Sequence, residues 1–354
     1  KIVENQQNNL ERKENMEKVK KQAKIWLCIG IALMLLASIV VSAVQTSGGK
    51  VTMKELSFET DSGYTMSAYL FIPDTATAEN PAPAIVVSHG YLNNKEMTDA
   101  NYVELSRRGY VVLSIDQPDH GDSDVIENFI TFMPDGVYQA VLAVSRMPFV
   151  DTSRIGITGH STGGRNVAFT LDAYGRNEHG KVYTGQPEDG SDYTTKVSSA
   201  LILAFFPDRY LLSNLPSGVN VGINFARYDE GATVQVTKVD GYQWPDMTVS
   251  PEAKFFINQT APGTFTMDTV ISVDESTGKD KVELSGYDNS QKVEIGKYYG
   301  SISDGTMRVV YNPNTSHQWQ FFSAKNASIT NQFFMDTLGA PNPISAGNQL
   351  WFVK

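Results

Sequence analysis

A serine stands between two glycines in the segment "GHSTG", residues 159–163. Residues 154–158 before it are typical of a strand, and a helix is predicted from Gly164 onward. In the pattern Gly-x-Ser-x-Gly, the glycines permit a sharp strand-to-helix turn that leaves the serine hydroxyl clear of the backbone. The amide of Thr162 then points to the place where an oxyanion would form. The pattern predicts Ser161 as a nucleophile, and the alternative is a turn that needs glycine only for its shape.

A serine with its ordinary pKa is a weak nucleophile and needs an adjacent base, most often histidine. Loops that follow parallel strands meet at one edge of the sheet, so a histidine distant in sequence can reach the serine. His317 follows the last predicted strand, and we predict it as the base; the alternative is a loop histidine that packs beside Trp319. His160 precedes the serine directly, and its side chain is expected to point away from it. The other histidines lie in loops: His89, His120 and His179.

The base in turn needs a carboxylate that orients it. Asp229 lies in "RYDEG", residues 227–231, after the penultimate predicted strand of the sheet. Its place in the chain fits the order serine, acid, histidine. We predict Asp229 as the acid, with Glu230 and Asp208 as the competing candidates.

As a set, five segments resemble the α/β-hydrolase family, and in particular its serine esterases and dienelactone hydrolases. These segments are "SHGY" (88–91), "DQPDHGDSD" (116–124), "GHSTG" (159–163), "RYDEG" (227–231) and "SHQW" (316–319). The resemblance covers about residues 51–340.

The resemblance implies a role for each matching residue. Ser161 would be the nucleophile, His317 the base and Asp229 the acid. The amides of Tyr91 and Thr162 would form the oxyanion hole. In the family, histidines at the positions of His89 and His120 shape their loops rather than react, so both are expected to be structural.

The elements around these residues predict an α/β fold. Apolar strand-like runs alternate with helical segments, which indicates a mostly parallel central sheet with helices on both faces. Two alternating runs in residues 51–73 predict a β-hairpin at its start. Residues 232–305 break the rhythm and are predicted as an insertion before the last strand, with a lid or a wall over the site as the two expected roles. No helix is recognisable directly after the strand that precedes Asp229.

An uncharged run of 20 residues, 25–44, is long enough as a helix to span about 30 Å, the thickness of a bilayer's hydrocarbon core. Residues 1–24 hold seven Lys and Arg against four Glu, a net charge of +3. The positive-inside rule places such a tail in the cytoplasm and everything beyond the run outside it. The alternative is a cleaved signal peptide ending at "VSA", residues 41–43.

This organisation predicts five segments along the chain. They are a basic cytoplasmic tail (1–24), a transmembrane helix (25–44), a short flexible linker (45–50), a hydrolase domain (51–340) and a C-terminal tail (341–354). The protein is expected in the cell membrane with its catalytic domain outside the cytoplasm.

Composition narrows the possible functions. The 354 residues carry a net charge of −10. Because the tail of residues 1–24 is positive, the rest of the chain is more negative still, and it is expected to repel nucleic acid. The single cysteine, Cys28, excludes an internal disulfide and a thiolate metal cluster. The acidic residues of 116–124 lack the spacing of a calcium loop, which leaves a calcium site as a minor alternative. No cofactor or metal is predicted, and the expected partners are a small acyl substrate and the membrane.

We therefore expect a metal-free serine hydrolase that cleaves carboxylic esters through an acyl-enzyme. The alternatives within the enzyme class are a peptidase, a thioesterase or an acyltransferase. A non-catalytic, hydrolase-like binding module is the alternative from another class.

Overall fold

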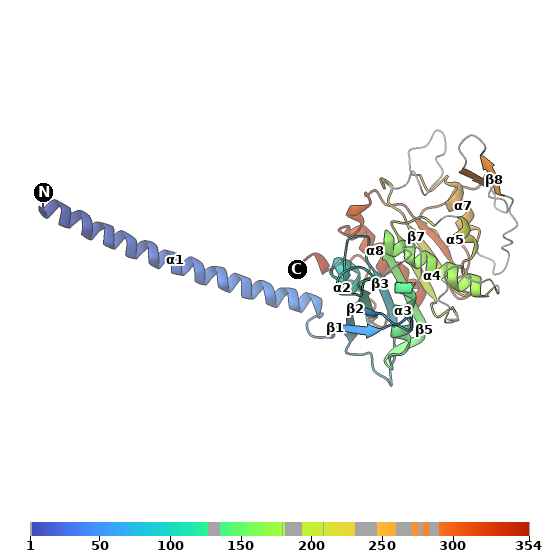
Figure 1. Ribbon diagram of the computed structural model, residues 1–354, viewed down its shortest axis with the longest axis horizontal. Coiled ribbons are helices and arrows are strands. Elements are labelled where there is room, and N and C mark those ends of the chain that lie inside the picture. Colours follow the sequence, from blue (N-terminus) through green and yellow to red (C-terminus); the bar gives the residue numbers. More distant parts are fainter. Residues whose placement is uncertain are drawn as a thin grey trace.

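The computed structural model describes residues 2–126, 135–178, 180, 193–207, 209–230, 246–259, 271–274, 279–282 and 290–353. In Figure 1 a long helix, α1 (Ile2–Gln45), projects away from the folded domain formed by the rest of the chain. The site residues predicted from the sequence are all described except Asp208 and His179, which lie outside these ranges.

The domain is built on a sheet of eight strands in the order β1-β2-β4-β3-β5-β6-β7-β10. Their bounds are β1 Val51–Glu59, β2 Thr65–Pro73, β3 Ala82–Ser88, β4 Val111–Ile115, β5 Val150–His160, β6 Ser199–Leu203, β7 Asn220–Asn224 and β10 Arg308–Tyr311. β1 and β2 form the predicted hairpin, and β2 also runs antiparallel to β4. The remaining pairs are parallel, so the carboxyl ends of β3, β5, β7 and β10 lie at the same edge.

Helices cover both faces of the sheet, as predicted (Figure 1). α3 (Asp135–Ser145) and α4 (Thr162–Glu178) pack together on one face, against β3 and β5. α2 (Asp99–Arg107) and α8 (Ala324–Leu338) pack on the other, where α8 crosses β5, β6 and β7. The central strands are apolar on both sides because both of their faces are buried: every residue of β3, β4, β6 and β7 is buried.

Two apolar cores result, one on each side of the sheet. Val86, Ile157 and Val167 belong to the core under α3 and α4. Val87, Val103 and Phe334 belong to the core under α2 and α8. Adjacent residues of β3 thus point to opposite cores, as the period of two in a strand requires.

Both ends of helix α8 are capped by local interactions. α8 begins after Ser323, whose hydroxyl accepts a hydrogen bond from the amide of Asn326. It ends at Gly339, which has a φ of 70° and so a backbone conformation that favours glycine. The caps fix where α8 stops and the C-terminal segment begins.

Part of the predicted insertion is described. It contains α7 (Pro251–Ile257), which begins after the capping residue Ser250, and a small antiparallel pair of β8 (Ile271–Asp274) and β9 (Lys279–Val282). Residues 231–245, 260–270, 275–278 and 283–289 lie outside the described residues, so the lid remains a prediction. The short elements that complete the fold are η1 Lys95–Thr98, α5 Arg209–Ser213, η2 Gln318–Gln320 and η3 Trp351–Val353.

α1 includes the whole apolar run and also the basic residues before it. It is the one helix of the described residues that is long and apolar enough to cross a membrane, a property that a signal sequence shares. At its end, residues 46–49 form a hydrogen-bonded turn in which the amide of Gly48 bonds to the carbonyl of Ala43. Val44 is buried in the same apolar cluster as Trp351 of η3, so α1 packs directly against the domain.

Candidate active site

Ser161 occupies a sharp turn between β5, which ends at His160, and α4, which begins at Thr162. The strand and the helix lie where the sequence predicts them, although the helix begins two residues earlier. Ser161 has a φ of 57°, a strained conformation for a residue with a side chain. This is the geometry of a nucleophile elbow, which exposes the serine hydroxyl at the carboxyl edge of the sheet.

The glycines of the elbow are needed for close packing. A Cβ on Gly163 would lie 2.5 Å from the carbonyl oxygens of Ser88 and His89, at the end of β3. A Cβ on Gly159 would lie 2.5 Å from the backbone of Gly163. Both distances are too short for a side chain, so the elbow packs directly on the loop that follows β3.

His317 and Asp229 meet Ser161 at this edge. The Nε2 atom of His317 lies 2.8 Å from the Oγ atom of Ser161. The Nδ1 atom of His317 lies 2.7 Å from the Oδ2 atom of Asp229. In the tautomer that satisfies both contacts, Nδ1–H donates to the carboxylate and Nε2 accepts from the serine hydroxyl.

The backbone explains why these two side chains meet. β7 and β10 are parallel neighbours, and the loops that follow them continue side by side. The amide of Arg227 donates to the carbonyl of Pro313, and the amide of Tyr228 donates to the carbonyl of Thr315. A further parallel bridge joins Tyr228 to Ser316, one residue before Asp229 and His317.

The electrostatics of the site favour a basic imidazole. Asp229 is only 3% exposed and lies against His317. Burial by itself lowers the pKa of His317, but the hydrogen bond to Asp229 and the charges of Asp229 and Glu230 outweigh it. The pKa of His317 is therefore raised above its ordinary value, so the imidazolium that forms when it takes a proton is stabilised.

Of the two competing acids, Glu230 is exposed, and its carboxylate accepts from the side-chain amide of Gln318 and from the backbone of His317 rather than from the imidazole. Asp208 lies outside the described residues. Of the two candidates that the structure describes, Asp229 and Glu230, Asp229 is the one that contacts the imidazole.

The loop after β3 carries Tyr91 and is held by His89. The Nδ1 atom of His89 lies 2.7 Å from the carbonyl oxygen of Gly90, and its Nε2 atom accepts from the amide of Gln117. Burial lowers the pKa of His89 to about 4, so its ring is neutral at pH 7. Since the carbonyl and the following N–H of a trans peptide point in opposite directions, this bond turns the Tyr91 N–H away from His89.

Tyr91 and Thr162, the predicted oxyanion hole, lie on the two segments that flank Ser161. Within the described residues, the backbone N–H of neither residue donates to a backbone carbonyl of a neighbouring loop. Thr162 is the first residue of α4, where backbone N–H groups have no partner within the helix.

Asp116 and Asp122, in the acidic segment after β4, face a cation supplied by the chain itself. The Nζ atom of Lys95 lies 2.8 Å from Asp116 Oδ2 and 2.7 Å from Asp122 Oδ2. The amide of Lys95 also donates to Asp116 Oδ1. These bonds fix η1 and so the end of the Tyr91 loop. Within the described ranges, no cluster of three or more His, Cys, Asp or Glu has the arrangement of a metal site.

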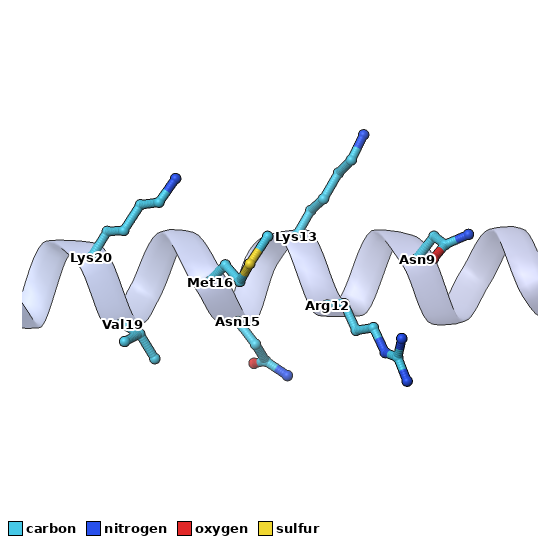
Figure 2. Close-up of a pocket in the computed structure, with 7 residues that line it drawn as sticks. All are labelled: Asn9, Arg12, Lys13, Asn15, Met16, Val19 and Lys20. Atoms are coloured by element: carbon cyan, nitrogen blue, oxygen red, sulfur yellow. The ribbon is translucent and has the colours of Figure 1, made fainter.

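A hollow along α1 is not part of this site (Figure 2). Its lining side chains all come from this one exposed helix and extend from it in different directions: Asn9, Arg12, Lys13, Asn15, Met16, Val19 and Lys20. A single exposed helix cannot enclose a ligand, and the hollow is remote from Ser161.

Comparison with known proteins agrees with this geometry. Residues 38–184 match the model of the family described as Esterase FrsA-like, a range that includes Ser161 and ends before Asp229 and His317. The sheet order and the sharp, glycine-flanked turn at Ser161 after β5 agree with this match. The chain has the α/β-hydrolase fold. The match to an esterase family supports an enzyme of the hydrolase class.

Solved structures similar to this α/β-hydrolase are distant in sequence. A hypothetical protein from Pseudomonas aeruginosa is 22% identical over 43% of this chain and 42% of its own, with a TM-score of 0.31. A dienelactone hydrolase-like promiscuous phosphotriesterase from metagenomic libraries is 14% identical over 51% of this chain and 71% of its own, with a TM-score of 0.38. An esterase from Pyrococcus furiosus is 13% identical over 52% of this chain and 74% of its own, with a TM-score of 0.37.

This α/β-hydrolase thus spans less than half the length of the first of these structures. No curated protein matches its sequence. The assignment of the α/β-hydrolase fold depends on the strand order of the sheet and on the family match, and not on these low TM-scores.

Sequence reasoning missed two contributors to the site. In the sequence, Lys95 cannot be distinguished from an ordinary surface lysine. Its burial depends on the contact with Asp116, which lies 21 residues later in the chain. His160 was expected to point away from the serine, and the structure adds that its Nε2 atom lies 2.9 Å from the carbonyl oxygen of His317.

Proposed function

We propose that this α/β-hydrolase is a serine hydrolase that cleaves carboxylic esters. The single observation that carries the proposal is the hydrogen-bonded series from Ser161 Oγ through the imidazole of His317 to the carboxylate of Asp229. The match to an esterase family supports an ester as the substrate.

In the first half of the reaction, Ser161 Oγ attacks the carbonyl carbon while its proton passes to Nε2 of His317. Asp229 stabilises the imidazolium, and the N–H groups of Tyr91 and Thr162 bind the oxyanion of the tetrahedral intermediate. His317 then gives its proton to the leaving alkoxide, the C–O bond breaks, and an alcohol departs from an acyl-enzyme.

In the second half, a water molecule loses a proton to His317 and attacks the acyl-enzyme. The second tetrahedral intermediate collapses, His317 returns the proton to Ser161 Oγ, and the carboxylic acid leaves. Every proton moves through one imidazole, so the position of His317 governs both halves.

We also propose that α1 anchors the enzyme, with the catalytic domain outside the cytoplasmic membrane. The apolar run and the basic residues before it support this topology. The double variant Ser217→Cys and Cys28→Ser, with position 217 exposed on the domain, tests this topology. An impermeant maleimide should label this cysteine in intact cells, whereas labelling only after lysis would contradict the topology.

The test of the activity uses the full chain purified in detergent. Nitrophenyl esters of rising acyl length are compared with aminoacyl nitroanilides. We expect hydrolysis of esters that falls at least about 1,000-fold in Ser161→Ala. Ser145→Ala, a serine of α3 that bonds only to its own helix, is the matched control and should keep full activity. Activity confined to the amides would overturn the ester substrate.

A further inference from the structure

His160 is a buried histidine that the proposed reaction does not use. It precedes the nucleophile directly, ends β5 and is only 4% exposed. Buried ionisable side chains are costly unless they are neutral and hydrogen-bonded, so a histidine at this position calls for a physical reason.

One ring nitrogen of His160 is bonded to the base itself. Its Nε2 atom lies 2.9 Å from the carbonyl oxygen of His317. A second donor to that oxygen, the backbone amide of Gln320 at the end of η2, lies 3.4 Å away. Because a carbonyl can only accept, His160 carries its proton on Nε2 and is the closer of the two donors.

The rest of the ring is fixed by its surroundings. The ring of Phe321 lies against it with 4.1 Å between centroids, and the ring of His317 lies 5.0 Å away. On another side, a Cβ on Gly90 would lie 3.3 Å from Nδ1 of His160, so the loop that carries Tyr91 touches the same ring. His160 therefore lies between the histidine loop and the oxyanion loop.

The ring of His160 is neutral at pH 7. Burial lowers the pKa of His160 to about 3, and the neighbouring His317 lowers it further than the bond to the His317 carbonyl raises it. Nδ1 has no hydrogen-bond partner among the described residues. A small cavity of about 20 Å³ beside the ring, which Gln320 and Asn326 also line, has room for about one water molecule. A neutral ring adds no positive charge that would oppose protonation of His317.

We propose that His160 is a positioning residue of the reaction, whose Nε2–H holds the main chain of His317 so that the imidazole stays between Ser161 and Asp229. The inference rests on the proposed function, because it assigns His160 a task only if His317 is the base. The chemistry itself stays with Ser161, His317 and Asp229.

Two nearly isosteric variants separate a positioning role from a merely structural one. In His160→Gln, the side-chain amide nitrogen can take the place of Nε2 and donate to the His317 carbonyl. In His160→Asn, the amide nitrogen takes the place of Nδ1 and falls short of that carbonyl. Both are polar and fit the site, so they differ chiefly in the bond in question.

The measurement is kcat and KM for an ester on the full chain, normalised to the fraction that a fluorophosphonate labels. We expect His160→Asn and His160→Leu to lose kcat about 10- to 100-fold with KM within about twofold, because a small displacement of a catalytic group has this effect. His160→Gln should retain kcat within about threefold. Phe334→Leu, a core change in α8, controls for lost stability and should keep kcat.

Equal values of kcat in the Gln and Asn variants would overturn the inference, as would wild-type kcat in His160→Leu. If none of the variants folds, a crystal structure of the wild-type chain decides. A distance above 3.5 Å between His160 Nε2 and the His317 carbonyl oxygen would then contradict the proposal. A wild-type chain that neither hydrolyses esters nor reacts with the probe would instead refute the proposed function.

Discussion

The Nδ1 atom of His317 lies 2.7 Å from the Oδ2 atom of Asp229, although 88 residues separate them in the chain. The contact exists because β7 and β10 are parallel neighbours whose following loops stay paired through Tyr228 and Ser316. Because the two strands are parallel, the chain leaves the carboxyl edge after Asp229 and enters β10 at the amino edge, and β10 then brings His317 back to the carboxyl edge.

The raised pKa of His317 predicts the acid limb of the pH profile. The base must be neutral to accept the proton of Ser161, so activity falls when the pH drops below the pKa of His317. Because this pKa is raised, kcat/KM for an ester should be half-maximal at a pH above 6.5. A limb with its midpoint well below 6.5 would contradict the contact with Asp229.

Asp229→Asn should move that limb and lower the rate. Loss of the carboxylate removes the hydrogen bond and the charge that raise the pKa of His317, so the midpoint should shift to lower pH. We expect kcat to fall about 1,000- to 10,000-fold, since an amide at this position favours the wrong tautomer of the imidazole.

Glu230→Gln is the matched control for this variant, because Glu230 is the neighbouring carboxylate and bonds to Gln318. It should shift the midpoint slightly in the same direction and leave kcat within a few-fold. If Glu230→Gln lost more activity than Asp229→Asn, the assignment of the acid would be wrong.

Gly163→Ala should damage the elbow. The new methyl group would lie 2.5 Å from the carbonyl oxygens of Ser88 and His89, and one of the two segments has to move. We expect a loss of about 1–3 kcal/mol of stability, as for overpacking in a core, and a reduced kcat. Thermal unfolding and ester hydrolysis measure the two effects.

The control is Gly347→Ala, where the methyl group would meet only the hydroxyl of Ser328 at an ordinary 3.8 Å. Stability and kcat should both remain close to wild type. Full activity in Gly163→Ala would show that the elbow does not need the close approach to the Tyr91 loop.

The prediction of this fold from sequence succeeded where local patterns carry the information. The Gly-x-Ser-x-Gly spacing locates the turn, since glycine is required by direct contacts at Gly159 and Gly163. Apolar runs locate the central strands because both of their faces are buried. The hairpin of β1 and β2 follows from alternation and the intervening "DSG".

Other features depend on contacts between distant segments and have little local signal. α7 was not predicted inside the insertion, because seven residues are too few to show a helical period. The role of Lys95 depends on the carboxylate of Asp116 beside it in the fold. The bond between His160 and His317 requires that β5 and the loop after β10 meet across two intervening strands.

Lys95→Met tests the buried ion pair under the Tyr91 loop. The side chains of Lys95 and Asp116 are 1% and 0% exposed, and the substitution leaves the Asp116 carboxylate buried without its cation. We expect a loss of about 3–5 kcal/mol in the free energy of unfolding, measured by chemical denaturation of the full chain.

Lys54→Met on the exposed face of β1 is the control, and a change within about 0.5 kcal/mol is expected there. Equal stability of the Lys95 and Lys54 variants would mean that the pair does not hold the loop.

The central claim is that the hydroxyl of Ser161 is activated by His317. Its most direct test is reaction of the full chain with a fluorophosphonate, followed by mass spectrometry of the labelled peptide. The account predicts one adduct, on Ser161, that is absent in Ser161→Ala and forms at least about 100-fold more slowly in His317→Ala. An adduct on a different residue, or an unchanged rate of labelling in His317→Ala, would contradict it.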